Sequence, residues 1–557
     1  MKKRICAIVL AIAVAAVGFS GCGKSKYDPG NFLPSGTSDN PYRIVKNRVA
    51  VKIFVPRGAS NPHFNDMKMF KKLSEITGLD FDFTEVDTSA YDQVRSAVWE
   101  DKANLPDLFL FNNSISEQVY YGDLGAFCAF NDPELVTGGV RAGHLIDNYM
   151  PTYKALLENN FGIDTDENAV RTATCSGGKM WSALSVNNVP RDLTFKMFIN
   201  QKWIENLRED GYTLPDAADI RTVEQYEQVL RAFKSGDPNR NGKADEIPVA
   251  SRSLEYLRNF ILASYGYVFP DLEVKNDGSG IVYVPATEEY RRYLDTMARW
   301  DADGLLDPAT FSIKTDAQLA QKGMEHRLGS FCSAAAYLVA GMKYESEYVT
   351  FGPLTSASYA GEPLQWGFPH FSPTGATIPA GTPYVREIAR LLDIMYGELG
   401  QQLIGYGEEN ADWAWDDETR SSWTFRIPEG WAGTQEDYRA TLTPNVGTGS
   451  ALFWNYGFVG KMNDPIIKKL NAMSEIYAPY LKVPVPSDIK LTVDEYNESE
   501  QIYASLSPFL ENEEYQFIKE KKATQGAPWD KYLSDLNKYK VERYTKIYNA
   551  AYLRRDG

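Results

Sequence analysis

Strand-like and helix-like segments alternate between residues 49 and 111, and this alternation constrains the fold more than any other feature of the sequence. The strand-like runs are VAVKIFVP from Val49, LDFDFTEV from Leu79 and DLFLF from Asp107. Between them, residues 64–77 and 90–102 carry apolar side chains at helical spacing. Strand, helix, strand, helix, strand is the pattern of a parallel α/β unit. The sequence therefore predicts an α/β fold.

Two amides stand where a parallel sheet of this kind binds its ligands. In open α/β sheets, ligands bind beyond the carboxyl ends of the strands. Asn112 and Asn113 directly follow the DLFLF run, so we predict that they contact a ligand. A simple turn at the strand end explains the same two residues, and the sequence leaves both interpretations open.

The chain is too long for a single core. Domains rarely exceed 250–300 residues, and this chain has 557. We predict two lobes between which the chain passes more than once. The first lobe is assigned residues 47–180 and 352–445, and the second residues 181–351 and 446–557. From Pro465 onward the sequence is mostly helical in pattern.

The N-terminus has the organisation of a signal peptide. Cationic residues precede an apolar run over 5–17, which is too short to span a bilayer, and small residues then lead to Cys22. Residues 1–21 resemble a bacterial lipoprotein signal, in which Cys22 would be lipidated and anchor the chain to the membrane. Residues 22–46 contain much Gly, Ser, Pro and Asn and are predicted to form a flexible tether.

Charge and cysteine content exclude several classes of protein. The formal net charge of −16 argues against binding nucleic acid through the overall field. It favours no anionic substrate either, although a local basic pocket stays possible. Cys128, Cys175 and Cys332 are odd in number and widely spaced, so a disulfide framework or a zinc site is not expected. They are predicted to be buried as small hydrophobic residues.

The run GDPNRNGKADEIP at 236–248 has the pattern of a calcium loop. Oxygen-bearing side chains recur at alternate positions, Gly242 allows a sharp turn, and Lys243 can offer its backbone carbonyl. Pro248 stands where an EF-hand carries a bidentate Glu, so Glu246 would supply those oxygens. A set rich in carboxylate and amide oxygens suits Ca²⁺ better than Zn²⁺. The predicted ligands are Asp237, Asn239, Asn241, Lys243, Asp245 and Glu246. A metal-free polar turn is the alternative.

Tryptophans concentrate between residues 407 and 458, beside Asp, Asn and Glu. A sugar site uses this combination, because aromatic rings stack on apolar C–H faces while carboxylates and amides bond to hydroxyls. Packing in a core explains each ring equally well. The candidate ligand-binding rings are Trp413, Trp415 and Trp454 from this region, with Trp181 and Trp366 from elsewhere in the chain.

The same region offers carboxylates for an alternative function. Glycoside hydrolysis needs two carboxylates on opposite sides of the scissile bond, and Asp412, Asp416, Asp417 and Glu418 lie next to the rings. A solvated acidic loop accounts for them as well. The histidines are isolated and there is no G-x-S-x-G motif. We assign no catalytic residue and predict a binding protein, with a secreted carbohydrate-active enzyme as the alternative.

The segment from Trp203 to Pro248 resembles the extracellular solute-binding proteins of ABC importers, of the large lipoprotein type that includes the alginate-binding proteins. The resemblance rests on WIENL at 203–207, the helical run at 220–235 and the calcium loop, with Ile220 in place of a Pro. WDADGLLDP at 300–308 and the C-terminal helical region also fit.

This resemblance implies a two-lobe, periplasmic-binding-protein-like fold of type II, with a multi-segment hinge and a helical C-terminus. It implies a monomer that is anchored at the cell surface or in the periplasm. Such a protein closes on an oligosaccharide between its lobes and delivers it to an ABC permease. The calcium would be structural. A peptide or another polar solute remains open as the ligand.

Overall fold

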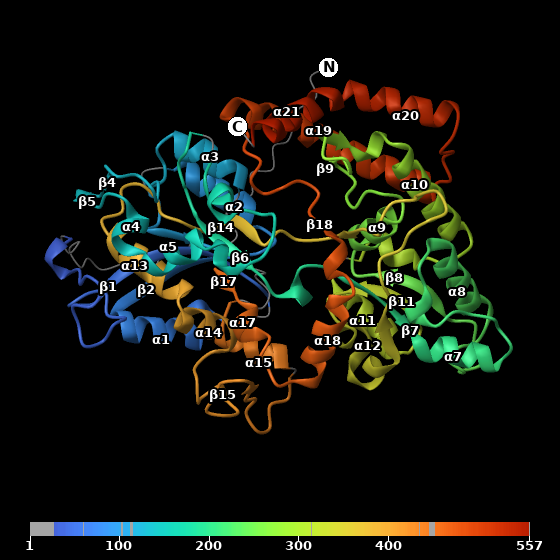
Figure 1. Ribbon diagram of the computed structural model, residues 1–557, viewed down its shortest axis with the longest axis horizontal. Coiled ribbons are helices and arrows are strands. Elements are labelled where there is room, and N and C mark those ends of the chain that lie inside the picture. The colour runs from blue at the N-terminus through green and yellow to red at the C-terminus, as the bar shows by residue number, and fades with distance from the viewer. Residues whose placement is uncertain are drawn as a thin grey trace, which may run out of the picture.

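Two β-sheets organise the protein, each inside a lobe of its own (Figure 1). The computed structural model describes residues 27–59, 61–101, 104–111, 115–175, 177–313, 315–433, 435–444 and 452–555. Within these ranges, no helix has the length and apolar character needed to cross a membrane.

The first lobe is built on a six-stranded sheet with the strand order β17-β6-β14-β3-β1-β2. Its strands are β1 (Val49–Arg57), β2 (Leu79–Asp87), β3 (Leu108–Leu110), β6 (Ala183–Asn187), β14 (Phe371–Thr377) and β17 (Phe453–Trp454). β1 runs parallel to β2 and β3, whereas β14 is antiparallel to both β3 and β6. The expected alternation of strands and helices after Val49 is confirmed.

Helices cover both faces of this sheet. They are α1 (Lys68–Thr77), α2 (Tyr91–Glu100), α3 (Ile115–Asp123), α4 (Leu145–Tyr149), α5 (Pro151–Glu158), α6 (Ala169–Ala173), α13 (Val385–Tyr396), α14 (Glu398–Tyr406), α15 (Gln435–Leu442) and α17 (Tyr456–Val459). Two small hairpins, β4 (Val136–Thr137) with β5 (Val140–Arg141) and β15 (Trp413–Trp415) with β16 (Trp423–Phe425), complete the lobe. Gly78 ends α1 in the left-handed conformation, which favours glycine.

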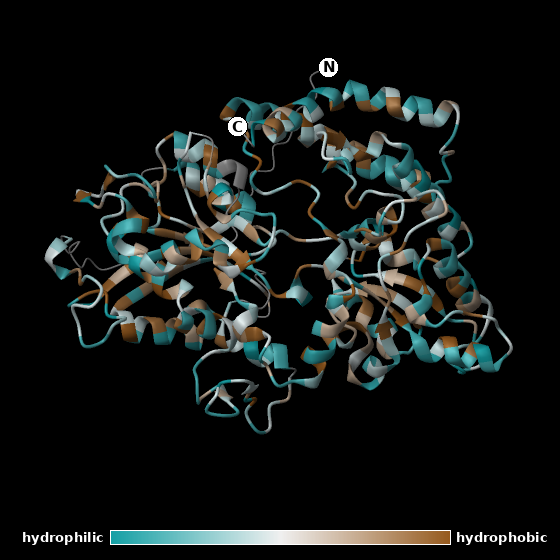
Figure 2. Cartoon of the chain, viewed as in Figure 1, coloured by the Kyte–Doolittle hydropathy of each residue, from teal (hydrophilic) through white to brown (hydrophobic). Residues whose placement is uncertain are grey.

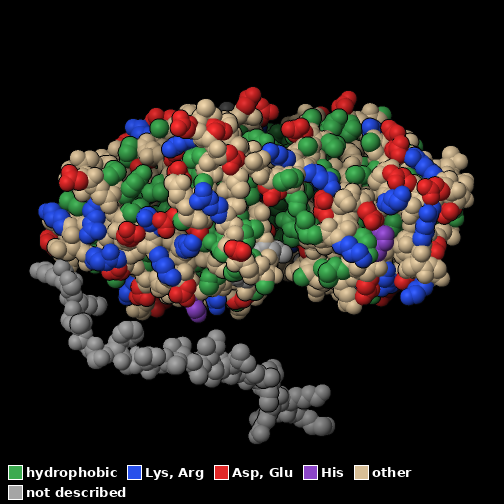
Figure 3. All heavy atoms as spheres, turned by 90° about the horizontal axis from the view of Figure 1, so that it is seen from below, with side chains coloured by type: hydrophobic (Ala, Val, Ile, Leu, Met, Phe, Trp, Pro, Cys, Tyr) green, Lys and Arg blue, Asp and Glu red, His purple; other side chains and the backbone are tan. Residues whose placement is uncertain are grey.

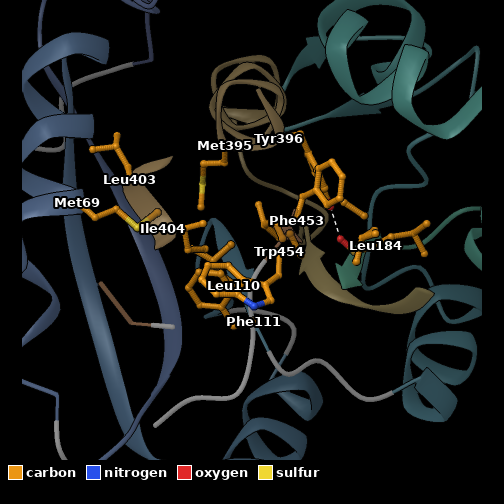
Figure 4. Packing of buried hydrophobic residues seen from close by; sticks show 14 of the residues in the cluster. Met69, Leu110, Phe111, Leu184, Met395, Tyr396, Leu403, Ile404, Phe453 and Trp454 are labelled. Atoms are coloured by element: carbon orange, nitrogen blue, oxygen red, sulfur yellow. Dashed lines mark hydrogen bonds between the residues drawn. The ribbon is translucent and has the colours of Figure 1, made fainter. Parts of the chain in front are cut away.

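The core of the first lobe joins segments that are far apart in the sequence. Figure 4 shows Leu110 of β3 and Phe453 of β17 in the same cluster as Met395 of α13. The hydroxyl of Tyr396, which is fully buried, donates to the carbonyl of Leu184 in β6. The first lobe therefore needs residues from three separate stretches of the chain.

The second lobe contains a four-stranded sheet with the order β12-β7-β11-β8. Its strands are β7 (Lys196–Asn200), β8 (Ile247–Ser251), β11 (Leu328–Ser333) and β12 (Tyr348–Thr350). The surrounding helices are α7 (Gln201–Glu209), α8 (Val223–Ser235), α9 (Leu254–Ala263), α10 (Glu288–Ala302), α11 (Asp316–Met324), α12 (Tyr337–Tyr344) and α18 (Pro465–Glu475). In Figure 2 the outer helices α7 and α20 are largely hydrophilic, as expected for solvated faces.

The C-terminal helices form the top of the second lobe in Figure 1. They are α19 (Val493–Lys519), α20 (Ala527–Lys538) and α21 (Val541–Arg554), and they lie against the hairpin of β9 (Leu272–Val274) and β10 (Ile281–Tyr283). This arrangement confirms the helical C-terminus. Residue Val493 at the start of α19 packs against the first lobe, so the C-terminal helices contact both lobes.

The chain passes between the lobes after β6, before β14 and after α17 (Figure 1). Two of these segments lie side by side, because Phe368 donates its backbone N–H to the carbonyl of Leu193 over 2.8 Å. Next to them, β13 (Gln365–Trp366) pairs in parallel with β18 (Leu481–Lys482). The connection between the lobes is therefore made of several adjacent segments.

The lobe assignment differs from the sequence-based one at two strands. β6 and β17 were placed in the second lobe, but both pair in the sheet of the first lobe. Each predicted boundary falls a few residues before the strand. A break in the sequence pattern shows where one element ends, but it does not show which sheet the next strand joins.

Residues 27–46 also differ from the flexible tether that the composition suggests. Phe32, Ile44 and Val45 are buried in the core of the first lobe. Arg390 of α13 holds this segment by donating to backbone carbonyls, including those of Arg43 at 3.0 Å and Pro41 at 3.1 Å. Three apolar residues and one buried guanidinium thus order a stretch that is otherwise polar.

The three described cysteines are buried and free, as small hydrophobic residues are expected to be. Cys332 lies in β11. The apolar stretch at 328–342 consists of β11 followed by the beginning of α12.

Asp271 gives the C-terminal helices a pH-dependent contact. Burial raises the pKa of this carboxyl to about 7, and Tyr544 of α21 donates to its Oδ2 at 3.3 Å. Because the folded state binds the proton more tightly than the unfolded chain, stability falls as pH rises from about 4 to about 7. The free energy of unfolding of Asp271→Asn relative to the wild type should therefore rise by about 2.6 kcal/mol between pH 5 and pH 8. Denaturant titrations at both pH values check this.

Asp277→Asn, an exposed change in the same hairpin, is the matched control. The difference between its free energy of unfolding and that of the wild type should be the same at both pH values. An equal pH response of the two variants would contradict the role of Asp271.

Candidate functional site

The carboxyl ends of the parallel strands β8 and β11 face the junction between the lobes. Arg252 follows β8 directly, and Ser333 is the last residue of β11. β7 is antiparallel to β11, so its first residue, Lys196, pairs with Ser333 at the same edge. Viewed from below, the two lobes meet along a furrow with hydrophobic side chains on its walls (Figure 3). In α/β folds this edge is where ligands bind.

Four aromatic rings gather at this edge, beside the segments that connect the lobes. Phe195 and Tyr256 have ring centres 4.0 Å apart, Tyr256 and Trp366 5.8 Å, and Trp366 and Phe368 4.5 Å. Phe368 keeps 37% of its surface exposed. Phe195, Trp366 and Phe368 come from the connecting segments, whereas Tyr256 belongs to α9. Such rings can stack on the apolar face of a sugar or another flat ligand.

Arg252 adds polar groups to the aromatic cluster. Its guanidinium lies 4.8 Å from the centre of the Phe195 ring and 3.4 Å from the carboxylate of Asp316. The Nε atom of Arg252 is buried and has no hydrogen-bond partner. Ser333 donates to the other oxygen of Asp316 at 2.7 Å. Burial raises the pKa of Asp316, and the charge of Arg252 opposes that shift.

Trp454 forms part of the first lobe's side of the junction, at the carboxyl end of β17. Its indole N–H donates to Asp192 at 2.6 Å, and Asp192 lies on the segment that leaves the first lobe. The guanidinium of Arg439 lies 5.5 Å from the Trp454 ring and is paired with Glu436 at 2.6 Å. Burial, followed by the charge of Glu436, raises the pKa of Tyr337 in α12 of the second lobe.

The other predicted rings have different surroundings. Trp413 has no exposed surface, and its N–H donates to the carbonyl of Gly407 at 3.1 Å. Trp415 is partly buried with Arg420 over its ring. Trp181 is buried over Gly122, where a Cβ would meet its ring at 2.5 Å.

The tryptophan-rich region is a packed cluster in its own right. Its rings contact one another at centre distances between 4.6 and 5.7 Å. The members of this cluster are Tyr406, Trp413, Trp423 and Phe458. The density of rings between residues 407 and 458 thus reflects, in large part, a small core beneath the β15–β16 hairpin.

Asn112 and Asn113 lie outside the described residues, and their proposed role stays a prediction. Conversely, the sequence analysis did not predict five residues of this site, which are Arg252, Asp316, Phe195, Tyr256 and Phe368. Arg252 could have been found, since the rule that points to Asn112 also points to the residue after the IPVAS strand. Phe195 and Phe368 carry no local signal, because only the folded hinge brings them together.

The predicted calcium loop joins α8 to β8, at the opposite end of the strand from Arg252. The T-x-x-Q pattern of Thr222 and Gln225 forms a capping box at the start of α8. Asp237 accepts from the backbone N–H groups of Asn241 and Gly242 at 3.1 and 2.9 Å. Gly242 adopts a φ of 74°, the left-handed turn that the pattern requires.

Hydrogen bonds link the side chains of the loop to one another. The Asn239 and Asn241 amides both donate to Oδ1 of Asp245, at 3.4 and 3.0 Å. Oε1 of Glu246 is buried without a hydrogen-bond partner, and burial raises its pKa, with the charges of Asp237 and Asp245 adding to the shift. Carboxylate oxygens are ligands of the kind that Ca²⁺ accepts.

Among the described residues, no group of three or more His, Cys, Asp or Glu side chains is arranged to hold a metal ion. The predicted set depends in addition on two amide oxygens and one backbone carbonyl. These are hard oxygen ligands of the kind that Ca²⁺ accepts alongside carboxylates.

The acidic residues considered for hydrolysis have local partners. Asp416 accepts from Ser422 and Thr424, each at 2.7 Å, and Asp417 accepts from Ser421 at 2.5 Å. Hydrogen bonds from Ser421 and Thr419 lower the pKa of Asp417 to about 2. Both side chains thus close exposed turns of the hairpin.

No protein-family model matches the chain. The fructooligosaccharide ABC transporter substrate-binding protein FusA of Streptococcus pneumoniae is 23% identical over 97% of this chain and 96% of its own length.

The structure of FusA in complex with kestose has a TM-score of 0.71 at 21% identity, covering 91% of this chain and 99% of that one. An EF-hand mutant of FusA in complex with fructo-nystose gives a TM-score of 0.71 at 19% identity, with the same coverage. The alginate-binding protein AlgQ2 without calcium ion gives 0.69 at 16% identity, covering 92% of this chain and 100% of that one.

These likenesses cover more than nine tenths of this chain and nearly the whole of each relative. The chain thus has the two-lobe α/β fold of the solute-binding proteins of ABC importers, and its resemblance to that group, the alginate-binding proteins included, is confirmed along nearly its whole length.

Proposed function

We propose that this protein is a membrane-anchored extracellular substrate-binding protein that captures an oligosaccharide between its lobes and delivers it to an ABC import permease. The observation that carries the proposal is the cluster of Trp366, Phe368 and Tyr256 beside the hinge, at the carboxyl ends of β8 and β11. The likeness to FusA, whose structure contains kestose, supports the same class of ligand.

The mechanism follows from the position of the rings. A sugar stacked on Tyr256 of the second lobe and on Trp366 and Phe368 of the connecting segments would contact Trp454 and its neighbours in the first lobe once the lobes approach. Such a ligand touches both lobes only in the closed state. Its higher affinity for the closed state than for the open state therefore drives closure. Trp181, Trp415, Asn112 and Asn113 remain candidate contacts at the first lobe.

We propose that lipidation of Cys22 anchors the protein, after removal of residues 1–21, on the outer side of the cell membrane or in the periplasm. The protein acts there as a monomer, and its partners are the permease subunits. These assignments rest on the sequence pattern at the N-terminus and on the transport role of FusA.

We also propose a structural calcium ion in the loop between α8 and β8. The side chains of Asp237, Asn239, Asn241, Asp245 and Glu246, with the carbonyl of Lys243, would hold it. An EF-hand mutant of FusA supports a loop of this type in a relative. Bound there, calcium would neutralise three neighbouring carboxylates and fix the start of β8, whose other end carries Arg252.

Ligand binding should be visible as a thermal shift. A ligand at about one hundred times its Kd adds roughly 2.7 kcal/mol to the free energy of unfolding. We expect one class of oligosaccharide, in a panel measured with calcium on a soluble form starting at Gly23, to raise the Tm and to be recovered intact. Consumption of the sugar would support the hydrolase alternative, and a panel with no response would contradict the proposal.

A further inference from the structure

Three arginines stand at the junction between the lobes, and each is paired with a carboxylate. Arg252 lies 3.4 Å from Asp316 in the second lobe. Arg439 lies 2.6 Å from Glu436 in the first lobe. The third pair, Arg191 with Asp192 at 3.6 Å, lies on the segment that connects them. Each pair sums to zero charge, so the junction carries guanidinium groups without a net positive field.

The same arginines have hydrogen-bonding capacity left over. One nitrogen of each is buried and has no hydrogen-bond partner: Nε of Arg252, Nη1 of Arg191 and Nη1 of Arg439. A buried donor without an acceptor costs about 1–3 kcal/mol. Because these nitrogens are buried, a ligand oxygen can reach one of them only if the guanidinium group turns toward the cleft.

Lys196 is the remaining cation at this edge of the second sheet. It has no exposed surface, and its ammonium donates to the backbone carbonyls of Arg191 at 2.7 Å and Thr194 at 3.5 Å. Its hydrogen bonds are therefore directed at the connecting segment. Lys196 is therefore not available to a ligand carboxylate at this edge.

We infer that the cleft selects neutral oligosaccharides over uronic ones. Arg252 and Asp316 together bind two neighbouring hydroxyl groups of the sugar. The guanidinium donates to one hydroxyl oxygen and the carboxylate accepts from the neighbouring hydroxyl, while Trp366 and Phe368 stack on the ring. A uronate would bring a carboxylate for which each of these guanidinium groups already has a partner, in Asp316, Glu436 or Asp192. The net charge of −16 adds a repulsive field at long range.

This inference rests on the proposed function, and its test separates the two. Kestose, maltotriose and cellotriose serve as neutral probes, and trigalacturonate and trimannuronate as anionic probes, in calorimetric titrations with calcium present. We expect binding to be confined to neutral sugars and to be insensitive to salt. A uronate that binds as tightly as the best neutral sugar would overturn the inference and leave the proposed function standing. Failure of all probes would overturn both.

Two variants test the residues themselves. Arg252→Gln should weaken the neutral sugar about 10- to 100-fold, because a charged hydrogen bond is lost. Asp316→Asn should weaken it about 10-fold and make uronate binding measurable, with an affinity that falls as salt rises. If Asp316→Asn prefers neutral sugars over uronates as strongly as the wild type does, the role given to Asp316 is overturned.

Arg543→Gln is the matched control. It removes an arginine from another carboxylate pair, with Glu498 at 2.5 Å, on the exposed surface of the C-terminal helices. Its affinity for the neutral sugar should equal that of the wild type. An equal loss in Arg543→Gln and Arg252→Gln would show that any broken ion pair has this effect, and would overturn the role given to Arg252.

Discussion

Removing calcium with a chelator is expected to destabilise the second lobe by about 4 kcal/mol, measured from a solution in which calcium stands at about one thousand times its Kd. Without the ion, Asp237, Asp245 and the buried Glu246 repel one another, and Oε1 of Glu246 has no hydrogen-bond partner. The Tm in calcium and in excess chelator measures the difference. Asp237→Ala should reproduce the low Tm and no longer respond to calcium.

The matched control is Asp277→Ala. Asp277 also caps a turn, by accepting from the backbone N–H of Ser279 at 2.9 Å, but in the β9–β10 hairpin. This variant should keep the full response to calcium. A wild-type Tm that chelation leaves unchanged would refute the structural calcium, whatever sugar the protein binds.

The second large effect is expected from Trp300→Ala, which should cost 3–5 kcal/mol of the second lobe's stability. Trp300 of α10 has no exposed surface, and its indole N–H donates to Glu227 of α8 at 2.8 Å. The substitution leaves a cavity between α10 and Tyr226, whose ring lies 5.7 Å away. Denaturant unfolding followed by circular dichroism measures the loss.

Trp431→Ala is the control for the loss of an indole. Trp431 keeps 38% of its surface exposed and packs edge-on against Tyr438. We expect this variant to lose about 1 kcal/mol or less. Equal losses in the two variants would mean that Trp300 is not the centre of a packed core.

Local patterns predicted local structure well. The Thr222–Gln225 capping box and the strand from Leu79 are found where the sequence places them. In each case neighbouring residues carry the physical cause, either a cap that satisfies free N–H groups or an alternation of apolar side chains. The general two-lobe fold followed from these patterns together with the resemblance to solute-binding proteins.

Placement over long distances could not be predicted in the same way. Nothing in the residues of β17 indicates that it pairs with β6, more than 260 positions earlier. Phe195 and Phe368 become neighbours only because two connecting segments run side by side. The buried Trp413 and the exposed Phe368 show the same limit, since residue type alone does not say which ring packs and which stays accessible.

The position of β14 has a consequence for how the protein is made. This strand lies between β3 and β6 in the sheet of the first lobe, yet it begins only at Phe371. A nascent chain that has reached the second lobe therefore still exposes the unpaired edges of β3 and β6, which can pair with other chains. Domains usually fold in the order of their synthesis. In this protein, the sheet of the first lobe cannot be completed until the later part of the chain, which contains β14, has been synthesised.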